Sequence, residues 1–424
     1  MGESCSVTGI QNKISKSLIA HYYSWDIWGT ALYFQMNVKR RSYLLLRKYG
    51  FAMVVLATVC VILGPYILAS SAFVPVQNTA KDLASKSVRV VQNKSIVLLD
   101  SESSLMCLNK SSLLKMDRDE AEQIFYRQKS TKMNIINDQY LITGRHVCEP
   151  NAPFLLIVVP SVPSHTNTRD VIRNTYGAFA RYDTDDKMAQ LVDGKKVKLA
   201  FIVGTDGNRI TDLALKREST LHNDIVQADF DDTYHNLTRK MLLALKWSSI
   251  YCGDIEFFLK ADEDVFVNVP ALVKRLQALP SNIRGAHGGA VYGHVHTNSP
   301  VRRSGRWNVG CDQYPFPRYP TYISGNSYGI SGSLVPKLFL MSQFYRYLPI
   351  EDAFITGILA RDLEVKHVDI WGFTFWDETE PLNPCEFYKQ NRITANNVNG
   401  LLKRQLMKTV LDYNKMCFYF RFWN

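Results

Sequence analysis

The sequence lacks internal repeats and low-complexity tracts, and it is short of acidic residues. Its 39 Asp and Glu stand against 50 Lys and Arg, which gives a formal charge of +11 and a pI near 9.1. Without repeats the chain is not a solenoid or an array, and a hydrophobic content of 46% excludes a disordered chain. The basic excess suits nucleic acid, an anionic membrane surface or a phosphorylated small molecule, and charge alone does not choose among them.

Charge is absent altogether from residues 49–69, YGFAMVVLATVCVILGPYILA, and the next charged residue is Lys81. The run is long enough to cross a bilayer as a helix. The segment KRRSYLLLRK precedes it, and such basic flanks favour a cytoplasmic N-terminus and a type II, single-pass topology. A cleaved signal peptide and a buried core helix are the alternatives, but 48 residues precede the run, and it is evenly apolar. We therefore expect a cytoplasmic segment at 1–48 and a transmembrane signal anchor at 49–69.

Cysteine spacings of the kind found in zinc sites are also absent. Six of the eight cysteines follow the apolar run, and an even set suits disulfides in an oxidising compartment, although sequence cannot give the pairing. Three N-x-Ser/Thr sequons, at Asn93, Asn109 and Asn236, lie downstream as well. Together these features predict a luminal C-terminal portion with three glycosylation sites. A luminal fold argues against a nucleic-acid partner.

The amino-acid composition of the chain changes along the part that follows the anchor. Residues 70–148 are rich in Ser, Lys and Asn and predict a luminal stem, whereas residues 149–424 predict a folded domain. In that domain FLLIVVP, VKLAFIVGTD and DIEFFLKADED are expected as buried strands, and RDVIRNTYGAFARY and LTRKMLLALKWSSIYC as helices. Strands that alternate with helices indicate an α/β fold with a mostly parallel central sheet and helices on both faces.

Three consecutive acids follow the third of these strands: Asp262, Glu263 and Asp264. In open α/β sheets ligands bind beyond the carboxyl ends of strands. Carboxylates crowded there raise one another's pKa unless a cation lies among them, and Mg²⁺ or Mn²⁺ prefers such oxygens together with phosphate. Two acids at i and i+2 of an extended segment point to the same side. Asp262 and Asp264 are thus candidates for a metal–phosphate clamp, and a solvated surface turn is the alternative.

A second acidic pair, Glu351 and Asp352, precedes a helical run. From spacing alone, an ordinary N-cap is the favoured interpretation of Asp352, with Glu351 complementing the helix dipole. A position at a helix N-terminus lowers a carboxylate's pKa, so we expect Asp352 to be ionised.

Four further groups are weaker candidates. Gly325 and Gly329 in YPTYISGNSYGIS allow the backbone to approach a ligand, and Tyr322 and Tyr328 can cover a sugar face. Arg173 shares a helix face with Arg169 and suits a phosphate or, equally, a structural ion pair. Three tryptophans suit a ligand groove or, more simply, core packing: Trp307, Trp371 and Trp376.

From Pro153 to Trp376 the chain resembles the β-1,3-glycosyltransferases of the galactosyltransferase family, which includes galactosyl- and N-acetylglucosaminyltransferases and, more distantly, Fringe. Six blocks match in order: SVPSHTNTRDVIRNTYG, LAFIVGT, DIVQADFDDTYHNLTRKMLLALKW, FFLKADEDVFVN, YPTYISGNSYGIS and IEDAFITGIL. The resemblance implies a GT-A fold, a UDP-sugar donor, a glycan acceptor, Mn²⁺ and inverting transfer in the Golgi lumen. Galactose is the first candidate sugar, and N-acetylglucosamine and N-acetylgalactosamine are the alternatives.

The same resemblance implies roles for the acids. Asp264 is the expected metal ligand with Asp262 in support, and Asp352 is the expected base. Glu263 replaces the middle Asp of the family's pattern and is expected to bind donor or substrate. Glu351 is expected to bind donor or acceptor. One departure is Asn397, which stands where the family usually carries a metal-binding His; His367 is a possible substitute. That departure keeps open a non-catalytic glycan-binding relative, and a glycoside hydrolase, which needs no metal–diphosphate clamp, is the other alternative.

Overall fold

The computed structural model of the protein describes residues 129–417, except residues 185, 285–288 and 378–381. Its strands are β1 (Tyr140–Ile142), β2 (Leu155–Pro160), β3 (Val197–Thr205), β4 (Ile225–Asp231), β5 (Phe257–Ala261), β6 (Phe266–Val267), β7 (Ala290–His296), β8 (Tyr322–Ser331), β9 (Lys366–Asp369) and β10 (Thr394–Ala395). Eight of them form one sheet in the order β1-β4-β3-β2-β5-β8-β7-β9, while β6 and β10 form a separate pair.

The helices complete the α/β arrangement. They are α4 (Thr166–Arg173), α5 (Asp186–Leu191), α6 (Arg209–His222), α7 (Leu237–Tyr251), α8 (Val269–Gln277), α9 (Val335–Ser342), α10 (Ala360–Asp362), α11 (Pro384–Lys389), α12 (Gly400–Leu411) and α13 (Tyr413–Cys417). Shorter turns are the 3-10 segments η2 (Tyr176–Thr184), η3 (Tyr234–Asn236) and η4 (Gly332–Leu334) and the π-helical η5 (Ala353–Leu359).

The sheet is parallel in one half and mixed in the other. Strands β4, β3, β2 and β5 are parallel neighbours, whereas β8 runs antiparallel to both β5 and β7. The three predicted buried strands are confirmed as β2, β3 and β5. Strands β1 and β4 were not predicted from the sequence. Strand β5 is therefore the fifth strand in chain order and not the third. Four of the seven neighbouring pairs are parallel, because β9 is parallel to β7 while β1 is antiparallel to β4.

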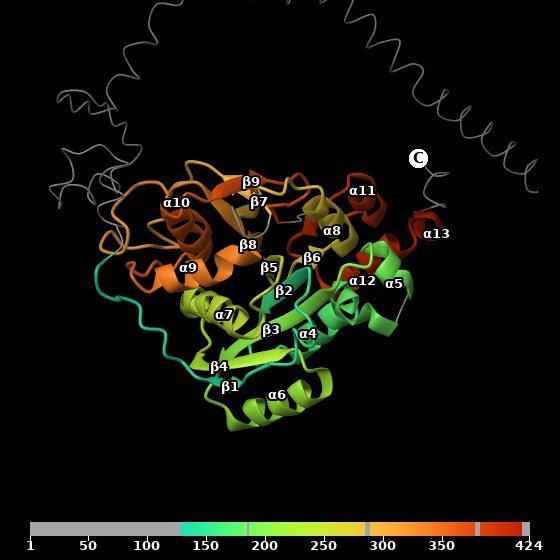
Figure 1. The fold of residues 1–424 in the computed structure, drawn as a ribbon, viewed down its shortest axis with the longest axis horizontal. Helices are drawn as coiled ribbons and strands as arrows, with labels where there is room; N and C mark the ends of the chain where they lie inside the picture. The colour runs from blue at the N-terminus through green and yellow to red at the C-terminus, as the bar shows by residue number, and fades with distance from the viewer. Residues whose placement is uncertain (1–128, 185, 285–288, 378–381, 418–424) are drawn as a thin grey trace, which may run out of the picture. The chain divides into compact units, whose positions relative to one another are not determined.

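Two hydrophobic cores lie on opposite faces of the sheet. Along β2, Leu156 and Val158 belong to one core, and the alternate residues Leu155, Ile157 and Val159 belong to the other. This period of two is what a strand buried on both faces requires. Figure 1 shows α7 and α9 on one side of the sheet and α4 and α12 on the other. Helices on both faces, as predicted, therefore cover the sheet.

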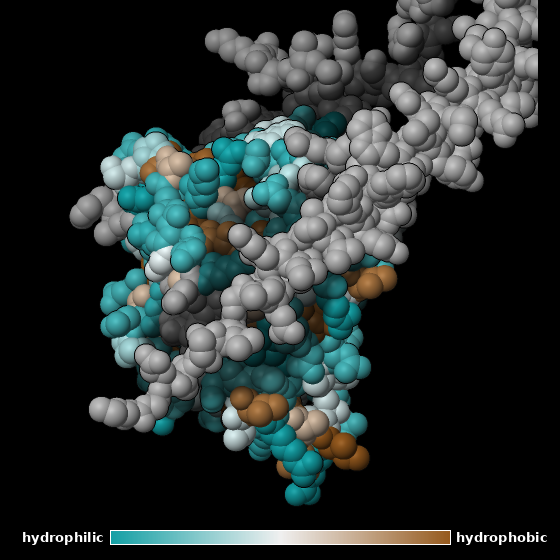
Figure 2. Space-filling view, turned by 90° about the vertical axis from the view of Figure 1, so that its right-hand side faces the viewer, coloured by the Kyte–Doolittle hydropathy of each residue, from teal (hydrophilic) through white to brown (hydrophobic). Residues whose placement is uncertain are grey.

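One face of the domain can be followed in a space-filling view. On the face shown in Figure 2, hydrophilic side chains predominate and the described apolar side chains form small separate groups. Single exposed apolar side chains, such as Ile210 and Leu221 of α6, are normal in folded proteins.

One predicted helix is two elements. The segment RDVIRNTYGAFARY contains α4, which ends at Arg173, and η2, which begins at Tyr176. Between them the Asn174 side chain donates to the Asp170 carbonyl at 2.8 Å, and the Thr175 hydroxyl donates to the Val171 carbonyl at 2.7 Å. Such side-chain bonds compete with the helical ladder, which explains the break.

The folded domain begins before the predicted boundary at residue 149. Strand β1 pairs with β4, and the Asn134 side chain donates to the Ser342 and Tyr345 carbonyls at 3.0 and 2.7 Å. Ile136 and Val147 are buried in the core beside α7. The last part of the predicted stem is therefore wrong as a stem, because its apolar residues find partners only on the folded domain.

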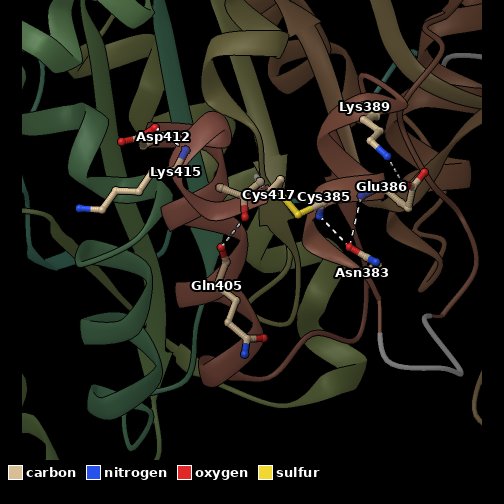
Figure 3. Close-up of a disulfide and its surroundings, with 9 residues drawn as sticks. Asn383, Cys385, Glu386, Lys389, Gln405, Asp412, Lys415 and Cys417 are labelled. Carbon is tan, nitrogen blue, oxygen red and sulfur yellow. Dashed lines mark hydrogen bonds and ion pairs between the residues drawn. A yellow bond between two sulfur atoms is a disulfide. The ribbon is translucent and has the colours of Figure 1, made fainter. Parts of the chain in front are cut away.

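Two disulfides are described, Cys148–Cys252 and Cys385–Cys417. The first joins the start of the domain to the end of α7. The second joins α11 to α13 at the C-terminal end, where Figure 3 shows the two cysteines on neighbouring helices.

Among the residues that the structure describes, 129–417 without the gaps given above, no helix has the length and apolar character to cross a membrane. The predicted anchor at 49–69 and the sequons at Asn93 and Asn109 lie outside the described residues.

Candidate active site

A cavity of about 790 Å³ lies at the carboxyl end of β5. Acids from three segments line it: Asp262 and Asp264 after β5, Glu351 and Asp352 before η5, and Asp377. The parallel strands β2 and β5 end at this edge of the sheet, which is where ligands bind in such folds. The structure thus brings the two predicted acidic pairs to one site.

The backbone after β5 turns sharply instead of continuing as a strand. The Val265 amide donates to the Asp262 carbonyl at 3.1 Å, and the Asp262 amide donates to the Asn326 carbonyl at 3.0 Å. The extended geometry assumed for Asp262 and Asp264 is therefore wrong, although both line the cavity. The chain then returns to the interior as β6, whose pairing with β10 brings Asn397 to the same cavity.

A buried lysine lies among the acids. Lys260 Nζ lies 2.7 Å from Asp262 Oδ1 and 3.2 Å from Glu351 Oε1, and it donates to the Gly325 carbonyl. Burial by itself would lower the pKa of Lys260, but the Asp262 and Glu351 carboxylates raise it above its ordinary value. Sequence reasoning missed this residue. The available signal was a lysine inside a buried strand, two residues before Asp262 and hence on the same side of the chain.

In the second acidic pair Glu351 is buried and Asp352 is half-buried, and both line the cavity. Burial raises the pKa of Glu351 to about 8, although the Lys260 ammonium, 3.2 Å from Glu351 Oε1, opposes the shift. Asp352 caps η5, with Oδ1 accepting from the Ala353 amide at 2.8 Å. Burial nevertheless raises the pKa of Asp352 to about 6. The expected lowering was wrong because desolvation outweighs the cap.

Gly325 and Tyr322 on β8 line the cavity, as the sequence suggested. A Cβ atom at Gly325 would lie 2.6 Å from Asp352 Oδ2, so only glycine leaves room for this carboxylate. Tyr322 belongs to an aromatic wall with His296 and Phe375. The centroid of the His296 ring lies 5.1 Å from that of Tyr322 and 5.5 Å from that of Phe375. His296 and Phe375 were not identified from sequence.

The remaining aromatic candidates differ in their exposure and in whether they line the cavity. Trp307 is 56% exposed and lines the cavity, whereas Tyr328 is buried and does not. Trp371 and Trp376 are 71% and 46% exposed, but neither lines the cavity.

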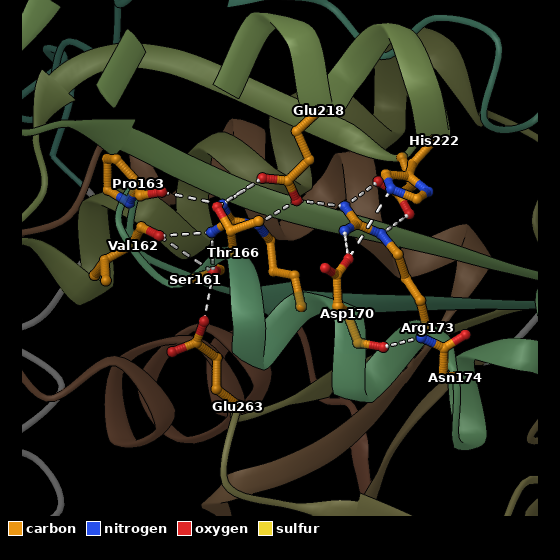
Figure 4. Close-up of polar contacts among 12 residues, drawn as sticks. Ser161, Val162, Pro163, Thr166, Asp170, Arg173, Asn174, Glu218, His222 and Glu263 are labelled. Carbon is orange, nitrogen blue, oxygen red and sulfur yellow. Dashed lines mark hydrogen bonds and ion pairs between the residues drawn. The ribbon is translucent and has the colours of Figure 1, made fainter. Parts of the chain in front are cut away.

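Arg173 lies elsewhere and is not a donor-binding residue. Its guanidinium pairs with Glu218 at 2.6 Å, with Asp224 at 2.7 Å and with Asp170 at 2.7 Å, and the side chain is 3% exposed. Figure 4 shows Arg173 and Asp170 of α4 facing Glu218 of α6. Of the two interpretations from sequence, a phosphate contact and a structural ion pair, the ion pair is therefore correct for Arg173.

Glu263 also points away from the main cavity. It accepts a hydrogen bond from the Ser161 hydroxyl and lies 2.6 Å from His165 Nδ1, so it joins the turn after β5 to the loop after β2 (Figure 4). Together with Asp264 it borders a second recess of about 390 Å³. Glu263 is therefore not placed to contact a substrate in the main cavity.

The donor set suits a hard divalent cation. Asp262, Asp264 and Asn397 present oxygen atoms to one cavity, and such a set holds Mg²⁺ or Mn²⁺ when phosphate supplies further oxygens. No three His, Cys, Asp or Glu side chains in the described part of the chain form a complete metal cluster. His367 is no substitute ligand, because its Nε2 lies 2.5 Å from the Thr356 carbonyl and it does not line the cavity.

Asn236 marks the rim of the site. It ends η3, is half-buried, and its amide donates to the Asp231 carbonyl at 2.8 Å. Its neighbours Tyr234 and Leu237 line the cavity, and Thr238 of the sequon is buried against Leu348. A glycan at this predicted site would therefore lie next to the cavity mouth.

The family model described as Galactosyltransferase matches residues 167–370. The lactosylceramide 1,3-N-acetyl-beta-D-glucosaminyltransferase A proteins of Danio rerio and Xenopus laevis are 33% and 31% identical, over 62% and 59% of this chain and 67% and 65% of their own. Beta-1,3-galactosyltransferase 1 of Mus musculus is 29% identical over 56% of this chain and 69% of its own.

The chain thus spans about two thirds of the length of these relatives. Among solved structures, a glycosyltransferase involved in glycosylation of the PBCV-1 major capsid has a TM-score of 0.30 at 8% identity, over 61% of this chain and 100% of that chain. The family model covers the segment that carries both acidic pairs, and one relative is 33% identical over two thirds of its length. The chain therefore belongs to the galactosyltransferase family.

Proposed function

We propose that this family member is an inverting β-1,3-glycosyltransferase that moves a hexose, galactose first among the candidates, from a UDP-sugar to the 3-hydroxyl of a glycan on a glycoprotein or glycolipid. The observation that carries the proposal is the cavity in which Asp262, Asp264, Glu351 and Asp352 meet around Lys260. We further propose that the protein is a single-pass type II protein of the Golgi membrane with this domain in the lumen.

The proposed reaction is one displacement. The acceptor 3-hydroxyl gives its proton to Asp352, whose Oδ1 is held by the Ala353 amide while Oδ2 lies on the Gly325 side. The acceptor oxygen bonds to the anomeric carbon as the bond from that carbon to UDP breaks, and the bonding pair leaves with UDP. Attack from the opposite face inverts the anomeric centre.

Charge on the leaving diphosphate requires compensation. When bound, a divalent ion such as Mn²⁺, held by Asp264 and supported by Asp262 and Asn397, would supply Lewis-acid stabilisation of that charge. Lys260 contacts both Asp262 and Glu351 and so links the two acidic segments.

The test uses full-length protein in detergent, a panel of UDP-galactose, UDP-N-acetylglucosamine and UDP-N-acetylgalactosamine, and measurement of UDP release in the presence of a glycan acceptor. We expect acceptor-dependent UDP release that EDTA abolishes and Mn²⁺ restores, with one donor preferred. Asp264→Ala should lose the metal response, and full turnover by this variant would contradict its assignment as a metal ligand. Release of free sugar from a glycoside without nucleotide would indicate a hydrolase, and failure to bind UDP with Mn²⁺ would indicate a non-catalytic relative.

A further inference from the structure

Two arginines on the rim of the active-site cavity have no acidic partner. Arg302 and Arg306 both line the cavity, both are exposed, and neither forms an ion pair with any described residue. The other basic side chain of the cavity, Lys260, is paired twice. A guanidinium left unpaired beside five acids that line the same cavity is available to an anionic ligand.

The rim segment is held rigidly from inside. Arg303, between the two exposed arginines, donates to the Val309, Tyr314 and Phe316 carbonyls at 2.9, 2.8 and 2.8 Å. The Val309 amide donates in turn to the Arg302 carbonyl at 2.9 Å. These bonds order the backbone that carries the exposed guanidiniums, so ligand binding would not have to order it first.

Arg306 is further oriented by an aromatic ring. Its guanidinium carbon lies 4.4 Å from the centroid of the Tyr234 ring on η3. Stacking uses the face of the guanidinium and leaves its N–H groups, which point outward in the plane, free to donate. The adjacent Trp307 is 56% exposed in the same cavity and offers an apolar face of the kind that covers a sugar ring.

The rim segment that carries Arg302 and Arg306 lies on the side of the cavity that holds Asp352, the proposed base. The Tyr319 amide donates to the Ser299 carbonyl at 2.9 Å, and Pro300 bridges to Arg318, so the rim segment follows Tyr319 closely. Burial raises the pKa of Tyr319, and the charge of Asp352 raises it further, which marks the two as neighbours. The acceptor hydroxyl must reach Asp352, whereas the donor diphosphate belongs with Asp264. The arginines therefore border the acceptor.

We propose that Arg302 and Arg306 bind an anionic substituent, a sulfate or carboxylate, on the acceptor glycan. This inference rests on the proposed function, because it takes the cavity to be a glycosyltransferase site.

The first test compares acceptors that differ only in charge. Full-length protein, with the donor that the UDP-sugar panel identifies, is given p-nitrophenyl β-galactoside and p-nitrophenyl β-N-acetylglucosaminide, each with and without a 6-O-sulfate. We expect kcat/KM to be about tenfold higher for the sulfated form of the preferred sugar, because a charge-assisted hydrogen bond contributes about 1.5–3 kcal/mol and 1.4 kcal/mol is tenfold.

Paired substitutions locate the effect. In Arg302→Gln/Arg306→Gln the ratio of sulfated to neutral kcat/KM should fall to about one, while Arg275→Gln should keep the ratio. Arg275 is the matched control because it is exposed on α8 and does not line the cavity. Equal use of both acceptors by the unaltered protein would overturn the proposal. A raised KM for the UDP-sugar with the acceptor ratio preserved would overturn it as well, since the arginines would then serve the donor diphosphate.

A binding measurement separates this proposal from the proposed function. The Asp352→Asn variant cannot use its base, so the affinities of the four acceptors for it report recognition without turnover. Tighter binding of a sulfated acceptor that the double substitution removes would uphold the anion site even if no UDP were released. Binding that ignores the sulfate would refute it even if transfer were robust.

Discussion

Two groups of buried charges can be compared within this fold. The α4–α6 network consists of Arg169, Arg173, Glu218 and Asp224, and its carboxylates are matched by guanidiniums at 2.6–2.8 Å. The cavity cluster consists of Lys260, Asp262, Glu351 and Asp352, in which one cation faces three acids. The first group has one guanidinium for each of its two carboxylates, with the half-exposed Asp170 contacting Arg173 at its edge, whereas the second group has more acids than cations.

The pKa values follow from that difference. Burial would raise the pKa of Glu218, but the Arg169 and Arg173 guanidiniums hold it below its ordinary value. In the cavity cluster burial prevails, and the pKa of Glu351 rises to about 8. A balanced group fixes structure, whereas surplus acids kept from water are poised to take up protons or cations, which is typical of functional sites.

The sharpest contrast is expected from Asp352→Asn. It removes the proposed base and keeps the shape, so transfer should fall by about 10²–10⁴-fold. UDP binding, measured by calorimetry, and the unfolding midpoint should be preserved. Equal loss of UDP binding and transfer would instead indicate that Asp352 has only a structural role, as the cap of η5.

The α4–α6 network should respond in the opposite way. Glu218→Gln leaves Arg169 without its carboxylate partner, and breaking a buried pair costs about 3–5 kcal/mol in the free energy of unfolding. Denaturant unfolding would measure the loss. Glu386→Gln is the matched control, because its pair with Lys389 is about half exposed and such surface pairs contribute about 0–1 kcal/mol. Similar losses for both variants would contradict the comparison.

A methyl group can disturb the cavity cluster without touching its charges. Gly325→Ala places a Cβ where Asp352 Oδ2 lies, so the carboxylate must move. Because a misplacement of about 1 Å can cost about 10²-fold, we expect kcat to fall by about 10- to 100-fold with little change in stability. Gly253→Ala, whose Cβ would lie 3.7 Å from its nearest neighbour, should leave turnover unaltered. A fully active Gly325→Ala variant would show that the position of Asp352 is not critical.

The smallest effect concerns pH. Because burial raises the pKa of Asp352 to about 6, its basic form is lost as pH falls through that value. We expect kcat/KM for the acceptor to fall about tenfold for each pH unit below about 6 and to be level above it. Protein whose activity persisted unchanged to pH 4 would show that Asp352 titrates at its ordinary value or is not the base.

The sequence anticipated much of one half of the fold. Strands β2, β3 and β5 are continuous apolar runs, because each is covered by helices on both faces, and such runs can be recognised locally. Strands β7 and β8 contain Gly, Ser, Tyr and His, since they border the cavity, and their partners lie far along the chain. The break between α4 and η2 and the folding of residues 129–148 onto the domain likewise depend on contacts that no local pattern contains.

For the site, sequence identified the chemistry but not the environment. Asp262, Asp264, Glu351 and Asp352 were chosen from their positions beside a strand and a helix. The raised pKa of Asp352 came from burial by residues of other elements, and it reversed the expectation drawn from the helix terminus alone. Arg173 had two local interpretations, and only Glu218 and Asp224, contributed by α6 and the residue before β4, decided between them.

The sequence by itself determined which residue types exist, which runs are buried, and to which family the motifs point, because these depend on local composition and order. Only the tertiary structure decided which acids share a cavity, which arginines are paired and which carboxylates lose their water. Those outcomes depend on distances and desolvation, and both arise when segments distant in the chain, such as those flanking β5, β8 and η5, pack together.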